Sequence, residues 1–166
     1  MSVLVNEGLN VEIINLISNI STKLKTRTFL VGGYVRDLLL GRKSKDIDVL
    51  VIGDGISFAS EVKKKLGSKA NLQIFKNFGT AMIAYNDLEI EFVGSRKDSY
   101  QKSSRNPVVS IGTFEDDISR RDFTINSIAI SLNEDNKGEI IDLFDGIQDL
   151  KKRHNYNPKR SQNYFL

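Results

Sequence analysis

Residues 29–51 read FLVGGYVRDLLLGRKSKDIDVLV, and the fold prediction starts from this stretch. Thr28–Val31 is a short apolar run typical of a buried strand, and Gly32-Gly33 then predicts a tight turn into a helix that ends near Gly41. In Asp46–Ile52, polar and apolar residues alternate before the run becomes wholly apolar, as in a half-buried central strand. The stretch therefore predicts a strand, a glycine turn, a helix and a second strand.

The flanking sequence predicts further helices and strands around this unit. Apolar residues at helical spacing predict helices over about 9–25 and over 56–66, the second closed by Gly67. A polar loop is expected over 95–115, a short helix around 116–121 and a helical or extended segment over 124–131. Strands are expected at Leu72–Phe75, Thr80–Tyr85, Leu88–Val93 and 139–143, the second and third joined by an Asn86-Asp87 turn. We expect an α/β (α+β) domain with a small mixed sheet and helices packed on it.

The composition is that of an ordinary globular domain. The chain has 166 residues, of which 40% are hydrophobic and 27% charged, and a net charge of +3, a mild bias that permits nucleic acid without requiring it. The lack of cysteine excludes disulfides and thiolate metal sites, and the single histidine, His154, excludes a histidine-rich zinc site. A chain without cysteine suits the reducing cytoplasm, where we expect this protein. With neither a signal peptide nor an apolar run of about 20 residues, we expect no membrane partner.

Two carboxylates at the start of a predicted strand indicate a metal site. Asp46 and Asp48 lie two residues apart on a strand, so both side chains project from the same face. Like charges at this separation repel unless a cation lies between them, and oxygen ligands with open positions suit Mg²⁺. Glu89 and Glu91 share a face of another predicted strand, and either one could supply a third carboxylate. A solvated strand end is the simpler interpretation of two aspartates taken alone.

The glycine turn is a candidate phosphate site. Gly32 and Gly33 let the backbone approach a ligand closely, and the helix that follows offers unpaired N–H groups. Arg36 lies one turn into that helix, where its guanidinium could grip phosphate oxygens, whereas Asp37 is expected to be a structural partner. The pattern matches neither a Walker loop nor a dinucleotide-binding loop, and a plain tight turn explains the glycines equally well.

A second basic stretch reads SRRDFTIN over residues 119–126. By itself, such a stretch is most simply a helix end with a salt bridge. In a nucleotide site, an arginine could hold phosphates and Asp122 could bind a ribose hydroxyl.

Taken together, six fragments resemble the class II tRNA nucleotidyltransferase (CCA-adding enzyme)/poly(A) polymerase family. They follow in the family's order: FLVGGYVRDLLLG at 29–41, KDIDVLV at 45–51, FGT at 78–80, EFVGSR at 91–96, EDDISRRDFTINSIAI at 115–130 and IIDLFDGIQDL at 140–150. The resemblance implies a polymerase-β-like nucleotidyltransferase head domain over residues 1–150, which adds nucleotides from ATP or CTP to an RNA 3′ end, in particular that of tRNA, with Mg²⁺.

The resemblance also implies roles for single residues. It gives Asp46 and Asp48 as metal ligands and Glu91, rather than Glu89, as the third catalytic carboxylate. Gly32, Gly33 and Arg36 would hold the triphosphate, Arg121 the nucleotide, and Asp122 would lie near the ribose.

The family pattern stops after Leu150. We expect residues 151–166 to be a tail outside this pattern, disordered or read in a shifted frame, and the chain to be a head domain alone that binds RNA weakly. Three functions stay open: an RNA nucleotidyltransferase head of the CCA-adding, A-adding or poly(A)-adding type, a minimal nucleotidyltransferase with another acceptor, and a fragment that binds metal and NTP without catalysis.

Overall fold

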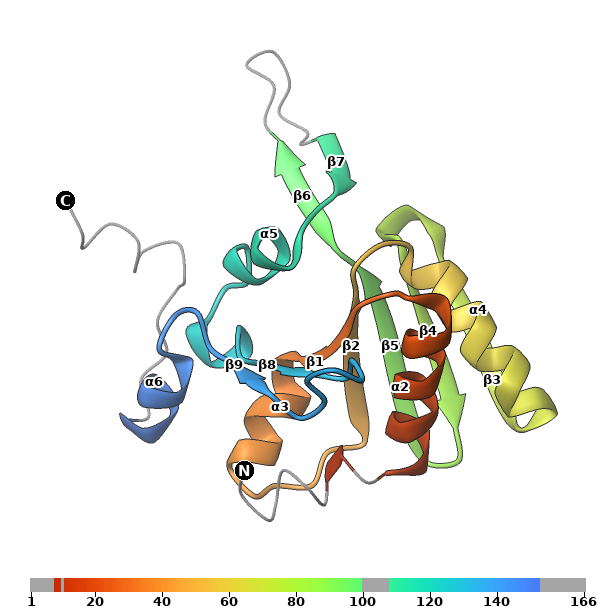
Figure 1. Ribbon diagram of the computed structural model, residues 1–166, viewed down its shortest axis with the longest axis horizontal. Helices are drawn as coiled ribbons and strands as arrows, with labels where there is room; N and C mark the ends of the chain where they lie inside the picture. The colour runs from red at the N-terminus through yellow and green to blue at the C-terminus, as the bar shows by residue number, and fades with distance from the viewer. Residues whose placement is uncertain (1–7, 10, 100–107, 153–166) are drawn as a thin grey trace.

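The predicted strand–turn–helix–strand unit lies at the centre of the molecule. The computed structural model describes residues 8–9, 11–99 and 108–152 (Figure 1). β1 (Thr28–Val31) leads directly into α3 (Gly32–Leu39), and the chain returns as β2 (Asp46–Val51) antiparallel to β1. Gly32 already belongs to the helix, so the turn and the helix start coincide.

Seven strands form the main sheet in the order β3-β4-β5-β2-β1-β8-β9. β2 and β5 are parallel, and every other neighbouring pair in this sheet is antiparallel. The strands not yet given are β3 (Ala70–Phe75), β4 (Thr80–Tyr85), β5 (Leu88–Gly94), β8 (Ala129–Ser131) and β9 (Ile140–Ile141). The prediction of a mixed sheet with helices packed on it is confirmed.

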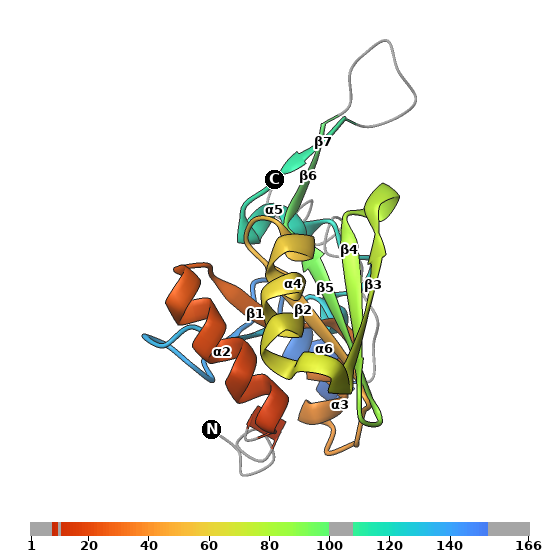
Figure 2. The same ribbon diagram turned by 90° about the vertical axis from the view of Figure 1, so that its right-hand side faces the viewer.

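Two helices cover one face of this sheet. α2 (Glu12–Leu24) and α4 (Gly55–Leu66) lie side by side over it (Figure 2). Asp54 caps α4 by accepting hydrogen bonds from the N–H groups of Ile56 and Ser57, and Gly67, at φ 65°, ends it. The predicted helix over 56–66 therefore has the expected end.

Alternation along the strands divides the apolar side chains between two cores. Leu30, Val49 and Val51 face α2 and α4, in the larger core. Phe29 and Leu50 face the other side, where α5 (Phe114–Ser119) packs on β1 and β8. This second core covers only part of its face, so the carboxylates of β2 and β5 lie on the part of that face that no helix of the second core covers.

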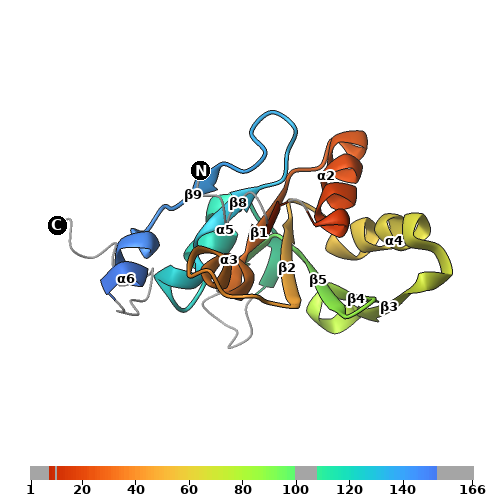
Figure 3. The same ribbon diagram turned by 90° about the horizontal axis from the view of Figure 1, so that it is seen from below.

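Helix α6 (Gly146–Lys152) packs against a 3₁₀ turn rather than on the sheet. It lies at the end of the molecule away from β3 and α4, against η3 (Thr124–Asn126) (Figure 3). The other 3₁₀ turns are η1 (Gly67–Lys69) and η2 (Lys76–Phe78). The segment 124–131, predicted as helical or extended, is both in turn, since η3 precedes β8. α6 was not predicted, and residues 153–166 of the expected tail lie outside the described residues.

The predicted polar loop over 95–115 is wrong in two places. Arg96–Ser99 (β6) and Val108–Ile111 (β7) pair as an antiparallel hairpin that projects from the main sheet (Figure 1). The run Val108–Ile111 (VVSI) is rich in β-branched residues, which favour a strand, but the prediction followed the polar stretch SRKDSYQKSSRNP that precedes it. Residues 100–107 lie outside the described residues.

In the part of the chain that the structure describes, we find no helix with the length and apolar character needed to cross a bilayer.

The start of α4 makes a backbone contact that requires glycine. A Cβ on Gly55 would lie 2.6 Å from the Gly94 nitrogen and 2.9 Å from the Val93 carbonyl carbon. We expect Gly55→Ala to lower the free energy of unfolding by about 1–3 kcal/mol, because the helix must move off β5. Lys65→Ala, an exposed substitution in the same helix, should change it by less than about 0.5 kcal/mol. Urea unfolding of both variants measures the difference, and equal values would contradict the close approach.

Candidate active site

Parallel pairing of β2 with β5 places carboxylates side by side. Asp48 is the register partner of Glu91, and Asp46 is the partner of Glu89. Neighbouring strands lie about 4.8 Å apart, so these four side chains form two adjacent pairs on one face. Ile47 and Ile90, between them in sequence, are buried on the opposite face. The structure thus places Asp46, Asp48 and Glu91 on one face of two adjacent strands.

Asp48 is the most perturbed of these groups. Burial raises the pKa of its carboxyl, and the negative charge of Glu91 raises this pKa further. The charge of Arg121 and a hydrogen bond from the Gly33 N–H lower it, while the charge of Asp46 again raises it. The net effect is a raised pKa, because burial and the neighbouring carboxylates outweigh the Arg121 charge and the Gly33 hydrogen bond.

Both glycines of the turn lie against the carboxylate of Asp48. Gly32 has φ 69°, and a Cβ at this position would lie 2.6 Å from Oδ2 of Asp48. Any side chain would therefore displace Asp48 or the helix start, besides being strained by the positive φ. Gly33 follows and donates its N–H to Asp48. The glycine pair thus allows the start of α3 to approach β2 closely. A plain tight turn does not explain this contact with Asp48.

Arg36 connects α3 to the last residue of the second basic stretch, Asn126. Its Nε lies 3.0 Å from Oδ1 of Asp37, and its Nη1 donates to Oδ1 of Asn126 at 3.1 Å. The expected structural role of Asp37 as a partner is thereby confirmed. Arg36 Nη2 lies 3.5 Å from the position of a Cβ on Gly33, so this guanidinium borders the glycine turn.

A buried aspartate that the sequence analysis did not single out holds the second basic stretch. Asp117 is fully buried in α5, and it accepts hydrogen bonds from Arg120 Nη2 at 2.8 Å and from Arg121 Nη2 at 3.1 Å. The signal was present in EDDISRRD, because residues three and four apart face each other on a helix. The expected helix end with a salt bridge is therefore confirmed.

Arg121 also faces the carboxylates. Its Nη1 lies 3.6 Å from the Cβ position of Gly32, and its charge acts on Asp48. Its Nε is buried without a hydrogen-bond partner among the described residues. Asp122, by contrast, is exposed and makes no hydrogen bond or ion pair with another described residue. The structure therefore brings Arg121 to the predicted group and leaves Asp122 outside its contacts.

The carboxylates do not close into a cage. Among residues 8–9, 11–99 and 108–152, no three histidine, cysteine, aspartate or glutamate side chains lie close enough together to hold a metal ion by themselves. A cation bound on this face would need further ligands from outside the protein.

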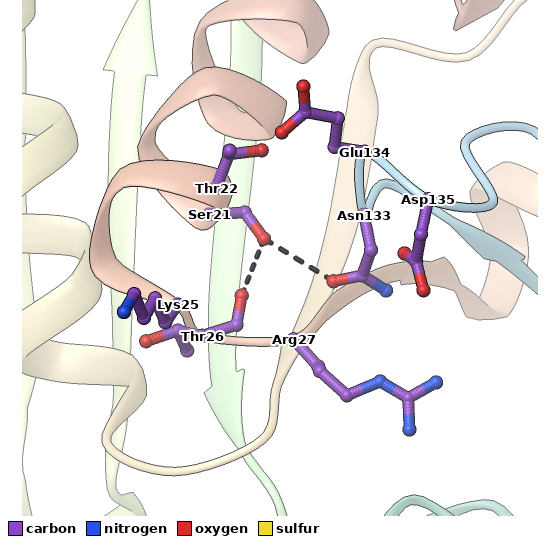
Figure 4. A pocket seen from close by; sticks show the side chains of 8 residues that line it. All are labelled: Ser21, Thr22, Lys25, Thr26, Arg27, Asn133, Glu134 and Asp135. Carbon is purple, nitrogen blue, oxygen red and sulfur yellow. Dashed lines mark hydrogen bonds between the residues drawn. The ribbon is translucent and has the colours of Figure 1, made fainter.

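A pocket of about 400 Å³ lies far from the carboxylates of β2 and β5. It is found near the start of β1, which pairs with the end of β2, whereas Asp46 and Asp48 lie at the opposite end of β2 (Figure 4). Asn133 accepts from the backbone N–H of Thr28 at 3.0 Å, and the Ser21 hydroxyl donates to Asn133 and to the Thr26 carbonyl. These bonds join α2, β1 and the residues after β8, so we interpret this pocket as structural.

Known proteins resemble this chain over the residues that form the sheet and the candidate site. The family described as the poly(A) polymerase head domain matches residues 28–154. An A-adding tRNA nucleotidyltransferase from Aquifex aeolicus (strain VF5) is 40% identical over 127 residues, which are 76% of this chain and 15% of that protein.

Two solved structures also resemble the chain. A CCA-adding enzyme in apo form II has a TM-score of 0.81 at 34% identity, covering 93% of this chain and 37% of that one. A tRNA nucleotidyltransferase complexed with a primer tRNA and an incoming ATP analog has a TM-score of 0.70 at 36% identity, covering 81% of this chain and 36% of that one. The chain thus spans well under half the length of the proteins it matches.

The raised pKa of Asp48 has a consequence for stability. At low pH the carboxyl is protonated in both the folded and the unfolded chain, and as the pH rises the unfolded chain ionises first, near pH 3.9. Between the two pKa values Asp48 stays protonated in the folded chain but is ionised in the unfolded chain. The free energy of unfolding therefore falls as the pH rises, until the higher pKa of the folded state is passed.

We therefore expect Asp48→Asn to raise the melting temperature by about 2 °C at pH 7 in chelator-treated buffer, with the gain vanishing below about pH 3.5. Glu134→Gln, which removes an exposed carboxylate far from the site, should leave the melting temperature unchanged. A variant less stable than wild type at pH 7 would show that Asp48 is a structural anchor instead.

Removal of the Asp117 charge should destabilise the protein, in contrast to removal of the Asp48 charge. Loss of the Asp117 carboxylate leaves two arginines without their buried partner, and we expect Asp117→Asn to lower the free energy of unfolding by about 3 kcal/mol. Glu115→Gln makes the same change of charge at an exposed position of α5 and should have little effect. Urea unfolding compares the two, and a near-neutral Asp117→Asn would contradict the buried ion-pair assignment.

Proposed function

The chain belongs to the poly(A) polymerase head-domain family, and on this premise we propose that it transfers nucleotides from NTPs to the 3′ end of an RNA. We propose ATP and CTP as donors and tRNA as acceptor, in keeping with the names of its A-adding and CCA-adding relatives. The observation that carries the proposal is the pairing of Asp48 with Glu91, with Asp46 on the same face and Gly33 and Arg121 directed at Asp48. The cysteine-free sequence suits a reducing compartment, so we propose the cytoplasm.

The donor set fits Mg²⁺. Asp46 and Asp48 offer hard oxygen ligands, and Mg²⁺ is usually bound through one or two carboxylates, with waters and substrate phosphates completing the shell. A pair of carboxylates that does not close into a cage suits this mode of binding. The raised pKa of Asp48 supports it as well, since a cation would offset the repulsion from Glu91. When bound, Mg²⁺ would activate the attacking hydroxyl and neutralise charge on the triphosphate.

The cationic groups lie on one side of these carboxylates. Gly33 lies in the first turn of α3 there, Arg36 borders the glycine turn, and Arg121 reaches the same place from just after α5. We propose that these groups hold the triphosphate, because guanidinium groups and helix starts both favour phosphate oxygens. Gly32 serves by leaving room for this approach, and exposed Asp122 is assigned to the ribose of the bound nucleotide.

Glu91 lies on the other side of Asp48, on β5. In a displacement at phosphorus, the attacking and leaving oxygens are roughly in line, so the acceptor hydroxyl must approach from the side away from the leaving pyrophosphate. Glu91 is placed to orient that hydroxyl, while Asp46 and Asp48 stand between it and the triphosphate groups. This division of roles makes each of the three carboxylates necessary for transfer.

We test the function with the 166-residue chain, Mg²⁺, labelled ATP or CTP, and tRNA that lacks its terminal nucleotides. Extension is expected with Mg²⁺ and not with excess chelator. Asp48→Asn should reduce the rate at least about 100-fold, equivalent to about 2.7 kcal/mol of transition-state stabilisation. Asp87→Asn, the same substitution at an exposed residue paired with Lys45, should retain the rate.

The outcomes separate the alternatives. Binding of NTP without transfer by the wild-type chain would favour the fragment that binds without catalysis. Transfer that persists in Asp48→Asn, or that needs no divalent cation, would contradict the proposed site.

A further inference from the structure

Two of the family-like fragments have no role in the site described so far. They are Phe78-Gly79-Thr80 and the arginine that ends EFVGSR, Arg96. The structure brings them together around a pocket of about 460 Å³, a volume within the range of small-ligand sites. Its lining consists of Phe75, Phe78, Thr80, Glu91, Val93 and Arg96.

The strand register places this pocket next to the carboxylates. Asp48, Glu91 and Met82 form one row across β2, β5 and β4. Leu50, Val93, Thr80 and Phe75 form the next row on the same face. The pocket therefore lies one row along from Asp48, and it shares Glu91 with the candidate active site.

Its position relative to Asp48 is opposite to that of the phosphate-binding groups. Gly33 follows β1, on one side of β2, whereas the pocket lies over β5, β4 and the end of β3, on the other side. The sheet order β3-β4-β5-β2-β1 thus separates the two by the carboxylates themselves. A ligand in the pocket would meet Glu91 from the side that the proposed triphosphate leaves free.

Two aromatic rings on this side are left open to solvent. Phe78 is 66% exposed and Phe75 40% exposed, and both line the pocket. Phe78 belongs to η2, the short turn that joins β3 to β4, so its ring is attached to the rim of the sheet. An accessible aromatic ring is a surface on which nucleic acid bases of any sequence can stack.

Arg96 supplies an unpaired donor on the same side. Its Nη2 is buried and has no hydrogen-bond partner among the described residues. The backbone of Gly79, at φ 62°, lies against it, since a Cβ there would be 3.3 Å from Nη2. A buried donor without an acceptor is costly, and a phosphate or ribose oxygen of a ligand would remove that cost.

We propose that this pocket binds the 3′-terminal nucleotide of the single-stranded RNA acceptor. The base stacks on Phe78, a backbone oxygen accepts from Arg96, and the terminal ribose is thereby directed to Glu91. The assignment rests on the proposed function, and it favours RNA over a second NTP because the groups suited to a triphosphate lie on the opposite side of Asp48. Phe78 and Arg96 are positioning residues for the acceptor.

The test measures acceptor binding apart from transfer. The 166-residue chain is titrated into a fluorescein-labelled RNA pentanucleotide that ends in a 3′-deoxynucleotide, with Mg²⁺ and ATP present, so that no bond can form. Phe78→Ala and Arg96→Gln should each weaken RNA binding at least about fivefold, whereas Phe78→Tyr, which keeps the ring, should bind within about twofold of wild type. Calorimetry should show ATP binding within about twofold of wild type in all three variants.

Matched controls come from exposed residues elsewhere. Ile111→Ala removes an apolar side chain that is 73% exposed, and Arg42→Gln removes an exposed positive charge. Both should bind RNA as wild type does. Melting temperatures show whether each variant is folded. Phe78→Ala should fold normally, because the side chain it removes is exposed.

Unchanged RNA binding in Phe78→Ala and Arg96→Gln would overturn the proposal. So would an equal loss of ATP binding, which would place the nucleotide donor in this pocket, and so would a wild-type chain that binds ATP but no RNA. The first two results would leave the proposed function standing, whereas a wild-type chain that binds ATP but no RNA would contradict the proposed function as well. Transfer that does not depend on Asp48 would contradict the proposed function alone.

Discussion

The parallel register of β2 and β5 is the constraint on which the site depends. It sets Asp48 opposite Glu91 at the spacing of neighbouring strands and turns both toward the face that α2 and α4 do not cover. Parallel neighbours need a long crossover, and here α4 with the β3–β4 hairpin supplies it. The crossover brings the start of α4 onto the end of β5, where Gly55 and Gly94 permit backbone contact. The helix packing and the carboxylate pair are thus consequences of one connection.

Holding like charges together has a cost, and the fold offsets part of it through a chain of contacts. Phe114 of α5 packs on Phe29 with ring centroids 4.5 Å apart, which fixes the short helix on the sheet. That helix buries Asp117, Asp117 holds Arg121, and the charge of Arg121 acts on Asp48. The compensation is incomplete, because burial and then the charge of Glu91 keep the pKa of Asp48 above its ordinary value. A cation bound at these carboxylates would offset their charge, so the raised pKa is consistent with a binding site.

The sequence predicted most of the main sheet and the carboxylate pair because each rests on local patterns. β1 and β4 have the predicted bounds, and the DIDVLV and LEIEFV strands showed their alternation directly. Which residues of neighbouring strands pair with each other was harder to predict. Asp46 and Asp48 alone could not decide between Glu89 and Glu91, which the register places opposite one aspartate each. The β6–β7 hairpin was missed because the polar stretch before Val108–Ile111 outweighed this short β-branched run. Asp117 was missed because helical spacing shows which residues can pair but not which of them is buried.

Anomalous diffraction from crystals grown with Mn²⁺ and a non-hydrolysable NTP tests the central claim most directly. A metal peak is expected about 2.0–2.2 Å from carboxylate oxygens of Asp46 and Asp48, with the phosphates on the side of Gly33 and Arg121. A metal and nucleotide bound elsewhere, with Asp48 free of both, would contradict the assignment of this face of β2 and β5 as the catalytic centre.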